Sequence, residues 1–221
     1  MFFPATDAKS KVDLSNRNLG RADLKSYLDK YQKNTISTLN LCLNELTPLV
    51  IGDLNNFILN QKMSLKELIL HRNKLSNEGI MALASIINDT CLDDVQLGAN
   101  EVGDDGVIAL CEKLKTNTHL KKLSLSHNHI GKNAILAIVD MLEVNRTLEY
   151  LSLESCQLSQ IEDVIPLMNK LLQVAYKNPT LRGIEVIANH LPQGFYSKFF
   201  DFYESKRAIA PSPSSSKCVI L

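Results

Sequence analysis

A pair of apolar residues, separated by one residue, recurs seven times along the chain. The steps between successive pairs are 27, 29, 27, 28, 28 and 33 residues. The pairs begin at Val12, Leu39, Leu68, Val95, Leu123, Leu151 and Ile184. A period of this length indicates one structural unit copied along the chain, and such a unit buries its apolar face only against its neighbours. The sequence therefore predicts seven stacked units over residues 12–193.

Each part of the unit favours one local structure. The apolar pair has the period of two that is typical of a strand with one face turned inward. Five residues after the pair begins, five of the seven units carry an asparagine: Asn44, Asn73, Asn100, Asn128 and Asn189. Because a buried asparagine offers two donors and an acceptor to the backbone of a sharp turn, we expect these five to form a ladder. This pattern accounts for the high counts of 35 Leu and 19 Asn.

The segments that lead from each turn to the next strand carry apolar residues at helical spacing. The sixth step is the longest and predicts a longer helix from Ile161 to Lys177, with Pro166 near its start. Two units depart from the asparagine pattern. Cys156 takes the position in the sixth unit, where its thiol retains weak hydrogen bonding, and Arg17 takes it in the first, where one face of the array is open.

These residues resemble the leucine-rich-repeat family, in the subclass of 28-residue repeats typified by ribonuclease inhibitor. The resemblance covers residues 10–193, which is nearly the whole chain. It implies an α/β solenoid of horseshoe shape, with a parallel β-sheet on the concave face and helices on the convex face. It also implies that a protein partner binds the concave face.

Both ends of such an array need a cover, because the terminal units would otherwise expose their core. We expect residues 1–11 to form an N-terminal cap. Residues 194–207 predict a C-terminal capping helix with aromatic residues on one face: Phe195, Tyr196, Phe199, Phe200, Phe202 and Tyr203. The alternative is that this helix docks a partner.

The residues that alternate with the inward-facing pairs are expected to line the concave face. Among them, His71, Arg72 and Tyr150 have the side chains best suited to anchor a partner. The full predicted protein-binding face contains His71, Arg72, Gln96, Lys122, Ser126, His127, Tyr150 and Glu154. The alternative is a solvated sheet face without a partner.

The sequence shows no enzyme signature. It contains no phosphate-binding glycine loop, nucleophile elbow or zinc-protease helix, and His127 with His129 lacks the further ligands that a metal site needs. Five scattered cysteines without a C-x-x-C pair indicate free thiols in a reducing compartment. The formal net charge of zero argues against nucleic acid as a ligand and against a general affinity for acidic membranes. We therefore predict a monomer that is not an enzyme and needs no cofactor or metal.

Residues 208–221 are rich in proline and serine and predict a flexible tail. The sequence Cys-Val-Ile-Leu at 218–221 is a C-a-a-X box of the type that geranylgeranyltransferase reads. We expect lipidation of Cys218 to hold the protein at the cytosolic face of eukaryotic membranes. One prenyl chain is a marginal anchor, and the few cationic residues near the tail are dispersed, so we expect reversible attachment. No signal peptide or transmembrane helix is visible, and without the lipid the protein is expected in the cytoplasm.

These features predict a non-enzymatic protein-binding module tethered to a membrane. A compact repeat domain with host-type lipidation resembles secreted bacterial effectors that act in eukaryotic cells. One alternative is a GTPase-activating protein or other small-GTPase regulator, because the Ran-activating proteins share this repeat subclass, and Arg17 is a candidate for that role. A second alternative is a substrate adaptor of a ubiquitin ligase.

Overall fold

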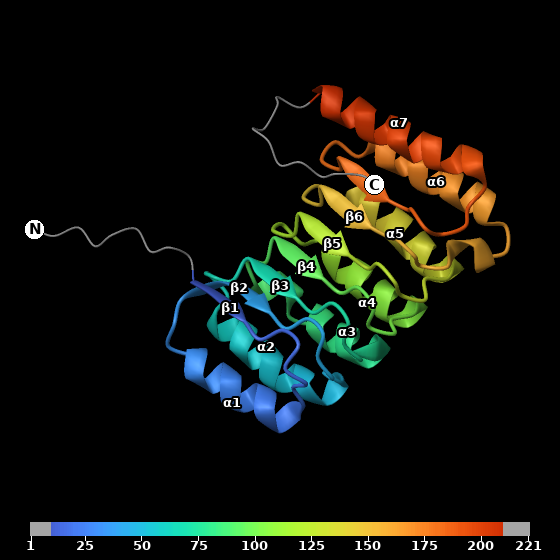
Figure 1. Ribbon diagram of the computed structural model, residues 1–221. Helices are drawn as coiled ribbons and strands as arrows, with labels where there is room; N and C mark the ends of the chain where they lie inside the picture. The colour runs from blue at the N-terminus through green and yellow to red at the C-terminus, as the bar shows by residue number, and fades with distance from the viewer. Residues whose placement is uncertain (1–9, 210–221) are drawn as a thin grey trace, which may run out of the picture.

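The computed structural model describes residues 10–209, which form one curved stack of strand–helix units (Figure 1). Over these residues, seven strands make one parallel sheet in which neighbours in sequence are neighbours in space. The strands are β1 (Ser10–Asp13), β2 (Ile36–Asn40), β3 (Glu67–Ile69), β4 (Asp94–Gln96), β5 (Lys122–Ser124), β6 (Tyr150–Ser152) and β7 (Gly183–Glu185). This topology confirms the predicted α/β solenoid with a parallel sheet on one face.

Helices cover the other face of the sheet (Figure 1). The α-helices are α1 (Arg21–Tyr31), α2 (Ile51–Asn60), α3 (Ser76–Ala84), α4 (Asp104–Leu114), α5 (Lys132–Val144), α6 (Val164–Lys177) and α7 (Gln193–Ile209). Short 3₁₀ segments are η1 (Pro48–Val50), η2 (Ile87–Asp89) and η3 (Leu158–Gln160). The sequence predicted that the sixth helix begins at Ile161, but it begins at Val164. The reason is that η3 occupies the preceding turn and Asp163 is left-handed, with a φ of 54°.

The register of the sheet follows the sequence period. Val12 lies opposite Leu39, Leu39 lies opposite Leu68, and the same alignment continues across the remaining strands. Both members of every apolar pair are at most 6% exposed. A shift of one residue would turn a whole strand's apolar set outward, so burial of the pairs fixes this register.

The chain leaves each strand through a left-handed residue. The residue four positions after the pair begins has a φ of 52–56° in all seven units, and none of these residues is glycine: Asn16, Leu43, Arg72, Ala99, His127, Ser155 and Ala188. An L-residue in this region costs about 1–2 kcal/mol, so interactions elsewhere must hold the turn. The next residue along the chain is the one that is asparagine in five of the seven units.

The asparagine side chains turn inward and bond to the backbone on both sides. Asn128 Nδ2 donates to the carbonyl oxygen of Leu125 in its own unit at 2.9 Å and to that of Leu97 in the preceding unit at 3.0 Å. Its Oδ1 accepts from the backbone N–H groups of Asn100 at 3.0 Å and Val102 at 3.1 Å. We call this row of side chains the turn ladder. Its other members, each bonded across units in the same way, are Asn44, Asn73, Asn100 and Asn189.

Cys156 interrupts the turn ladder. Its Sγ donates to the carbonyl oxygen of Leu125 at 3.2 Å, but a sulfur faces the backbone of Asn128 where the other units place an amide oxygen. Burial raises the pKa of the Cys156 thiol to about 11, so the thiol is neutral at physiological pH. Because a thiol is a weak donor and a weak acceptor, the hydrogen bonds at this position of the turn ladder are weaker than those in the other units.

Replacing Cys156 by Asn is expected to complete the turn ladder and to raise the free energy of unfolding by about 1 kcal/mol, the net worth of a typical hydrogen bond. Chemical denaturation followed by circular dichroism measures the change. The matched control is Cys111→Asn, because Cys111 is 1% exposed within the core and the same amide there should cost about 2 kcal/mol or more. A Cys156→Asn protein that is less stable than the parent would contradict this interpretation.

A second row of amide side chains, which the sequence did not lead us to predict, joins the C-terminal ends of the helices. Asn145, directly after α5, donates to the carbonyl oxygen of Leu114 at the end of α4 at 2.7 Å. The same arrangement links other successive helix ends through Gln61, Asn117 and Asn178. We call these four side chains the helix-end ladder. The two ladders therefore join most adjacent units at both ends of the helix–strand connection.

The helix α7 covers the last unit. Phe195, Phe199 and Phe202 are at most 5% exposed, and Lys206 Nζ donates to the backbone oxygen of Asn178 at 2.7 Å. Burial lowers the pKa of Lys206. The helix runs to Ile209, two residues into the segment predicted as tail.

The N-terminal boundary also differs from the predicted one. The first strand starts at Ser10, within the segment predicted as the N-terminal cap, because residues 10–13 pair with β2. The remaining part of that predicted cap, residues 1–9, and the predicted tail from residue 210 onward lie outside the described residues.

Candidate functional site

The concave face is built by the side chains that alternate with the buried pairs. Each strand places one such residue before the pair, one within it and one after it, so parallel strands align them in rows across the sheet. The row within the pairs includes Ile69, Gln96, Ser124, Ser152 and Glu185, and the row after them includes His71, Gly98, Ser126, Glu154 and Ile187.

The predicted binding residues differ in how far solvent reaches them. Four are exposed: Arg72, Lys122, His127 and Tyr150. Three are half-buried: His71, Gln96 and Glu154. Ser126 is only 6% exposed, so its side chain packs against its neighbours and offers little surface to a partner. Arg72 and His127 occupy the left-handed turn positions that follow the strands.

A glycine at the centre of the concave face brings three of these residues together. A Cβ at Gly98 would lie 2.4 Å from His71 Nδ1 and 2.5 Å from Ser126 Oγ, so both side chains use the space that the glycine leaves. The ring of His71 also meets that of His127 edge-on, with centroids 6.3 Å apart. Burial lowers the pKa of His71, and the nearby Arg72 and His127 add to the effect. This cluster is therefore a compact polar centre in which the neutral form of the His71 imidazole is favoured.

A mixed-charge row crosses the sheet before the apolar pairs. Thr38 Oγ1 donates to Glu67 Oε2 at 3.0 Å, and Lys122 Nζ lies 3.9 Å from Asp94 Oδ2. Burial raises the pKa of Asp94, while the cation of Lys122 opposes the shift. These contacts hold the row in place and leave the Lys122 side chain exposed at its edge.

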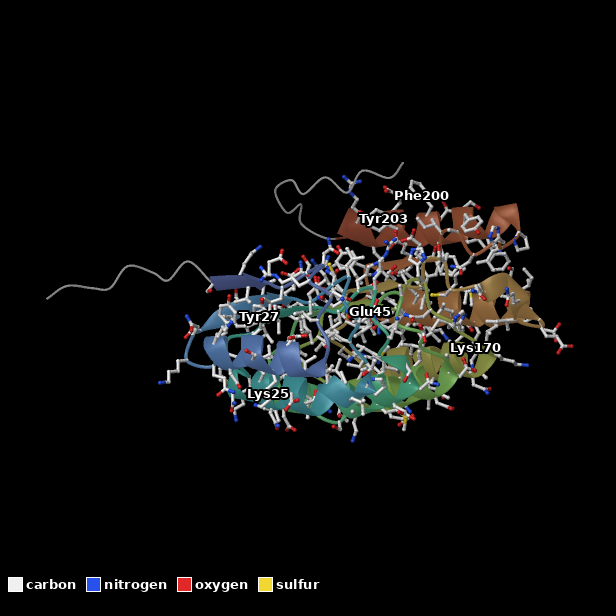
Figure 2. The ribbon with its side chains drawn as sticks, turned by 60° about the horizontal axis from the view of Figure 1, so that its bottom comes forward. Lys25, Tyr27, Glu45, Lys170, Phe200 and Tyr203 are labelled. Atoms are coloured by element: carbon white, nitrogen blue, oxygen red, sulfur yellow. The ribbon has the colours of Figure 1, made fainter. Side chains whose placement is uncertain are left out.

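Aromatic residues border the C-terminal end of the concave face. Gly183 lies between two of these rings, because a Cβ there would be 3.2 Å from the ring of Tyr150 and 3.5 Å from that of Tyr203. Tyr203 and the exposed Phe200 come from α7 (Figure 2). The sequence did not assign Tyr203 to this face, since the contact depends on how α7 folds back on β7. The last helix thus adds aromatic side chains to the border of the concave face.

The remaining candidate residues stand apart from this face. The guanidinium of Arg17 lies over the ring of Tyr27, 5.5 Å from its centroid, and donates to the backbone oxygen of Asp13 at 3.4 Å. Within residues 10–209, no three His, Cys, Asp or Glu side chains are grouped to hold a metal ion. No helix in the same range has the length and apolar character to cross a bilayer. Cys218 lies outside the described residues.

The seven-unit sheet and its turn ladder have the architecture of a leucine-rich-repeat solenoid. The family described as Leucine Rich repeat matches residues 61–84, 88–111 and 116–139. Actin-binding site 2 of leiomodin-1 has a similar structure, with a TM-score of 0.54 and 17% identity over 72% of this chain and 87% of its own. The tropomodulin C-terminal domain of Caenorhabditis elegans gives a TM-score of 0.59 and 14% identity over 72% of this chain and 93% of its own. No curated protein matches the sequence.

Proposed function

We propose that the protein is a non-enzymatic binding module that holds a protein partner on its concave face. The observation that carries the proposal is the pair of exposed anchor-type side chains on the concave face, Arg72 next to the Gly98 cluster and Tyr150 next to Gly183. Within the described residues, Arg72 forms no ion pair, and Tyr150 is 39% exposed. Arg and Tyr are the side chains that most often dominate binding energy in protein interfaces.

Actin is the first defined partner to test, because the similar region of leiomodin-1 is an actin-binding site. The identity of 17% supports a common fold, so a shared ligand has to be measured directly.

The test compares the parent protein with the double variant Arg72→Ala, Tyr150→Ala. Both proteins are used to capture partners from eukaryotic cell extract and, separately, are sedimented with purified actin filaments. The amount of partner that the variant captures is expected to be at least tenfold lower, because two anchors worth about 1–2 kcal/mol each are removed. The control is Lys132→Ala, because Lys132 is exposed at the start of α5 on the other side of the molecule. Equal capture by all three proteins would contradict binding through the concave face.

The second part of the proposal is a lipid tether at Cys218, in a bacterial effector that acts inside a eukaryotic host cell. The Cys-Val-Ile-Leu sequence at 218–221 supports recognition by a host geranylgeranyltransferase. Incubating the purified protein with geranylgeranyl pyrophosphate and the transferase should add one lipid mass, and Cys218→Ser should add none. An unchanged mass of the parent protein would remove the tether from the proposal. No observation on the described residues favours the small-GTPase regulator or the ubiquitin-ligase adaptor.

A further inference from the structure

The repeat helices run in one direction, so their C-terminal ends lie along one rim of the solenoid (Figure 1). The helix-end ladder joins these ends to one another. Lys206 extends the row to α7, because its Nζ donates to the backbone oxygen of Asn178 at the end of α6. We call this edge the helix-end rim and the opposite edge the helix-start rim.

The two rims differ in their balance of charge, although Lys132 lies on the helix-start rim and Asp29, Glu112 and Glu143 lie on the helix-end rim. The first turns of the helices hold Asp23, Asp53, Glu78, Asp104 and Asp105. The last turns, and the residues that directly follow them, hold Lys30, Lys62, Lys113, Arg146 and Lys177. The helix macrodipole favours this placement. The chain is neutral as a whole, yet its charges are separated along the helix axes.

Several cations on the helix-end rim have no intramolecular counter-ion. Glu112 and Glu204 are each paired with a neighbouring cation on their own helix. Among the described residues, Lys62, Lys113 and Lys177 are exposed and form no ion pair. These three lysines therefore remain available to an external anion.

Exposed apolar side chains lie on the same rim beside these cations. Met63, Val144 and Tyr176 are 74%, 53% and 47% exposed. Met63 follows Lys62, and Tyr176 precedes Lys177. Apolar and tyrosine side chains next to lysines are the combination that favours a membrane–water interface, where the apolar part enters and the charge stays at the headgroups.

A groove of about 330 Å³ opens between α5 and α6 toward this rim. Its apolar lining includes Leu142 and Val174. Its charged lining consists of Arg146, Lys170, Lys177 and one carboxylate, Glu143. The lining of the groove therefore has more cationic than anionic side chains, together with apolar residues.

We propose that the helix-end rim is a membrane-docking surface that binds anionic phospholipid headgroups. Charge complementarity supports this occupant, and so does the place where the described chain ends. Lys206 fixes the last turns of α7 at this rim, and the described chain ends there with the helix at Ile209. Residues 210–221, with Cys218 among them, follow in the sequence. The inference rests on the proposed lipid tether, because a lipid inserted in a bilayer would turn this rim toward the same bilayer.

The rim supplies the second signal that a single lipid lacks. One prenyl chain binds membranes marginally, and each Lys or Arg close to an anionic surface adds about 1 kcal/mol. The rim lysines come from units far apart in the sequence, and stacking gathers them on one edge.

The test uses the Cys218→Ser protein, so that no lipid contributes, and sediments it with phosphatidylcholine vesicles with and without phosphatidylserine. Binding is expected only to vesicles that contain phosphatidylserine, and added salt should release it. Lys177→Glu should weaken binding about fivefold or more, and Met63→Ser should weaken it as well. The matched control is Lys132→Glu, the same charge reversal on the helix-start rim, which should bind like the parent.

The outcomes separate the rim from the tether. If geranylgeranylated protein binds both kinds of vesicle equally and Lys177→Glu has no effect, the rim proposal is overturned and the tether stands. If unlipidated protein binds phosphatidylserine vesicles through the rim while Cys218 accepts no lipid, the rim stands and the tether falls. Equal weakening by Lys177→Glu and Lys132→Glu would also overturn the rim proposal, because it would show attraction without a defined surface.

Discussion

Replacing Asn128 by Ala is expected to lower the free energy of unfolding by about 3–5 kcal/mol. The side chain is 1% exposed and bonds to backbone groups of two units. Alanine would leave the N–H groups of Asn100 and Val102 without this acceptor in a place that water does not reach, while the carbonyl of Leu97 would keep only the amide of Asn100 as its donor. Several unsatisfied buried groups cost more than one lost hydrogen bond, which is why the effect is large.

Urea denaturation of the variant, followed by circular dichroism, measures this loss. The matched control is Asn133→Ala, because Asn133 is an exposed asparagine near the start of α5. Its replacement should change stability by less than about 0.5 kcal/mol. Equal effects at the two positions would mean that the turn ladder does not stabilise the fold.

Replacing Phe202 by Ala is expected to cost about 3–5 kcal/mol, as is usual for truncation of a buried aromatic ring. Phe202 is fully buried, and its ring meets that of Tyr176 edge-on at 5.2 Å between centroids. The ammonium of Lys206 lies 5.6 Å from the same ring. Loss of the ring should loosen α7 from the last unit before the central units open.

Hydrogen exchange locates this loosening: amides of β7 and α6 should exchange faster in the Phe202→Ala protein, while those of β3 and β4 keep their protection. Phe200→Ala is the control, since Phe200 lies on the same helix but is 53% exposed and should change stability by less than about 0.5 kcal/mol. Uniformly faster exchange in all units would contradict the role of α7 as a local cover.

The sheet register and the turn ladder were predictable because both are set by distance from the apolar pair. A residue five positions after the start of each pair must meet its counterpart in the next unit once the strands align. The same rule placed the concave rows, including His71 and Tyr150. Cys156 was recognisable as an exception for the same reason.

The helix-end ladder was not predictable from that rule. Asn117 and Asn145 each follow the start of their pair by 22 residues, but Asn178 follows it by 27, because the sixth unit is longer. Counted back from the next pair, all three stand six residues away, and that count would have found them. The burial of Ser126 depends on packing around Gly98, and the charged rims depend on helix direction. Neither the burial of Ser126 nor the charge of the rims can be derived from residue spacing within one unit.

The two ladders make neighbouring units interchangeable. Each unit offers the next the same backbone donors and acceptors, so a chain without residues 95–122 would place the Leu68 unit against the Leu123 unit, with Asn73 and Asn128 in adjacent rungs. Duplication of a unit would likewise preserve the pattern. The width of the concave face can therefore change in whole strands during evolution while the fold is kept, so that partner size is adjusted by the number of units.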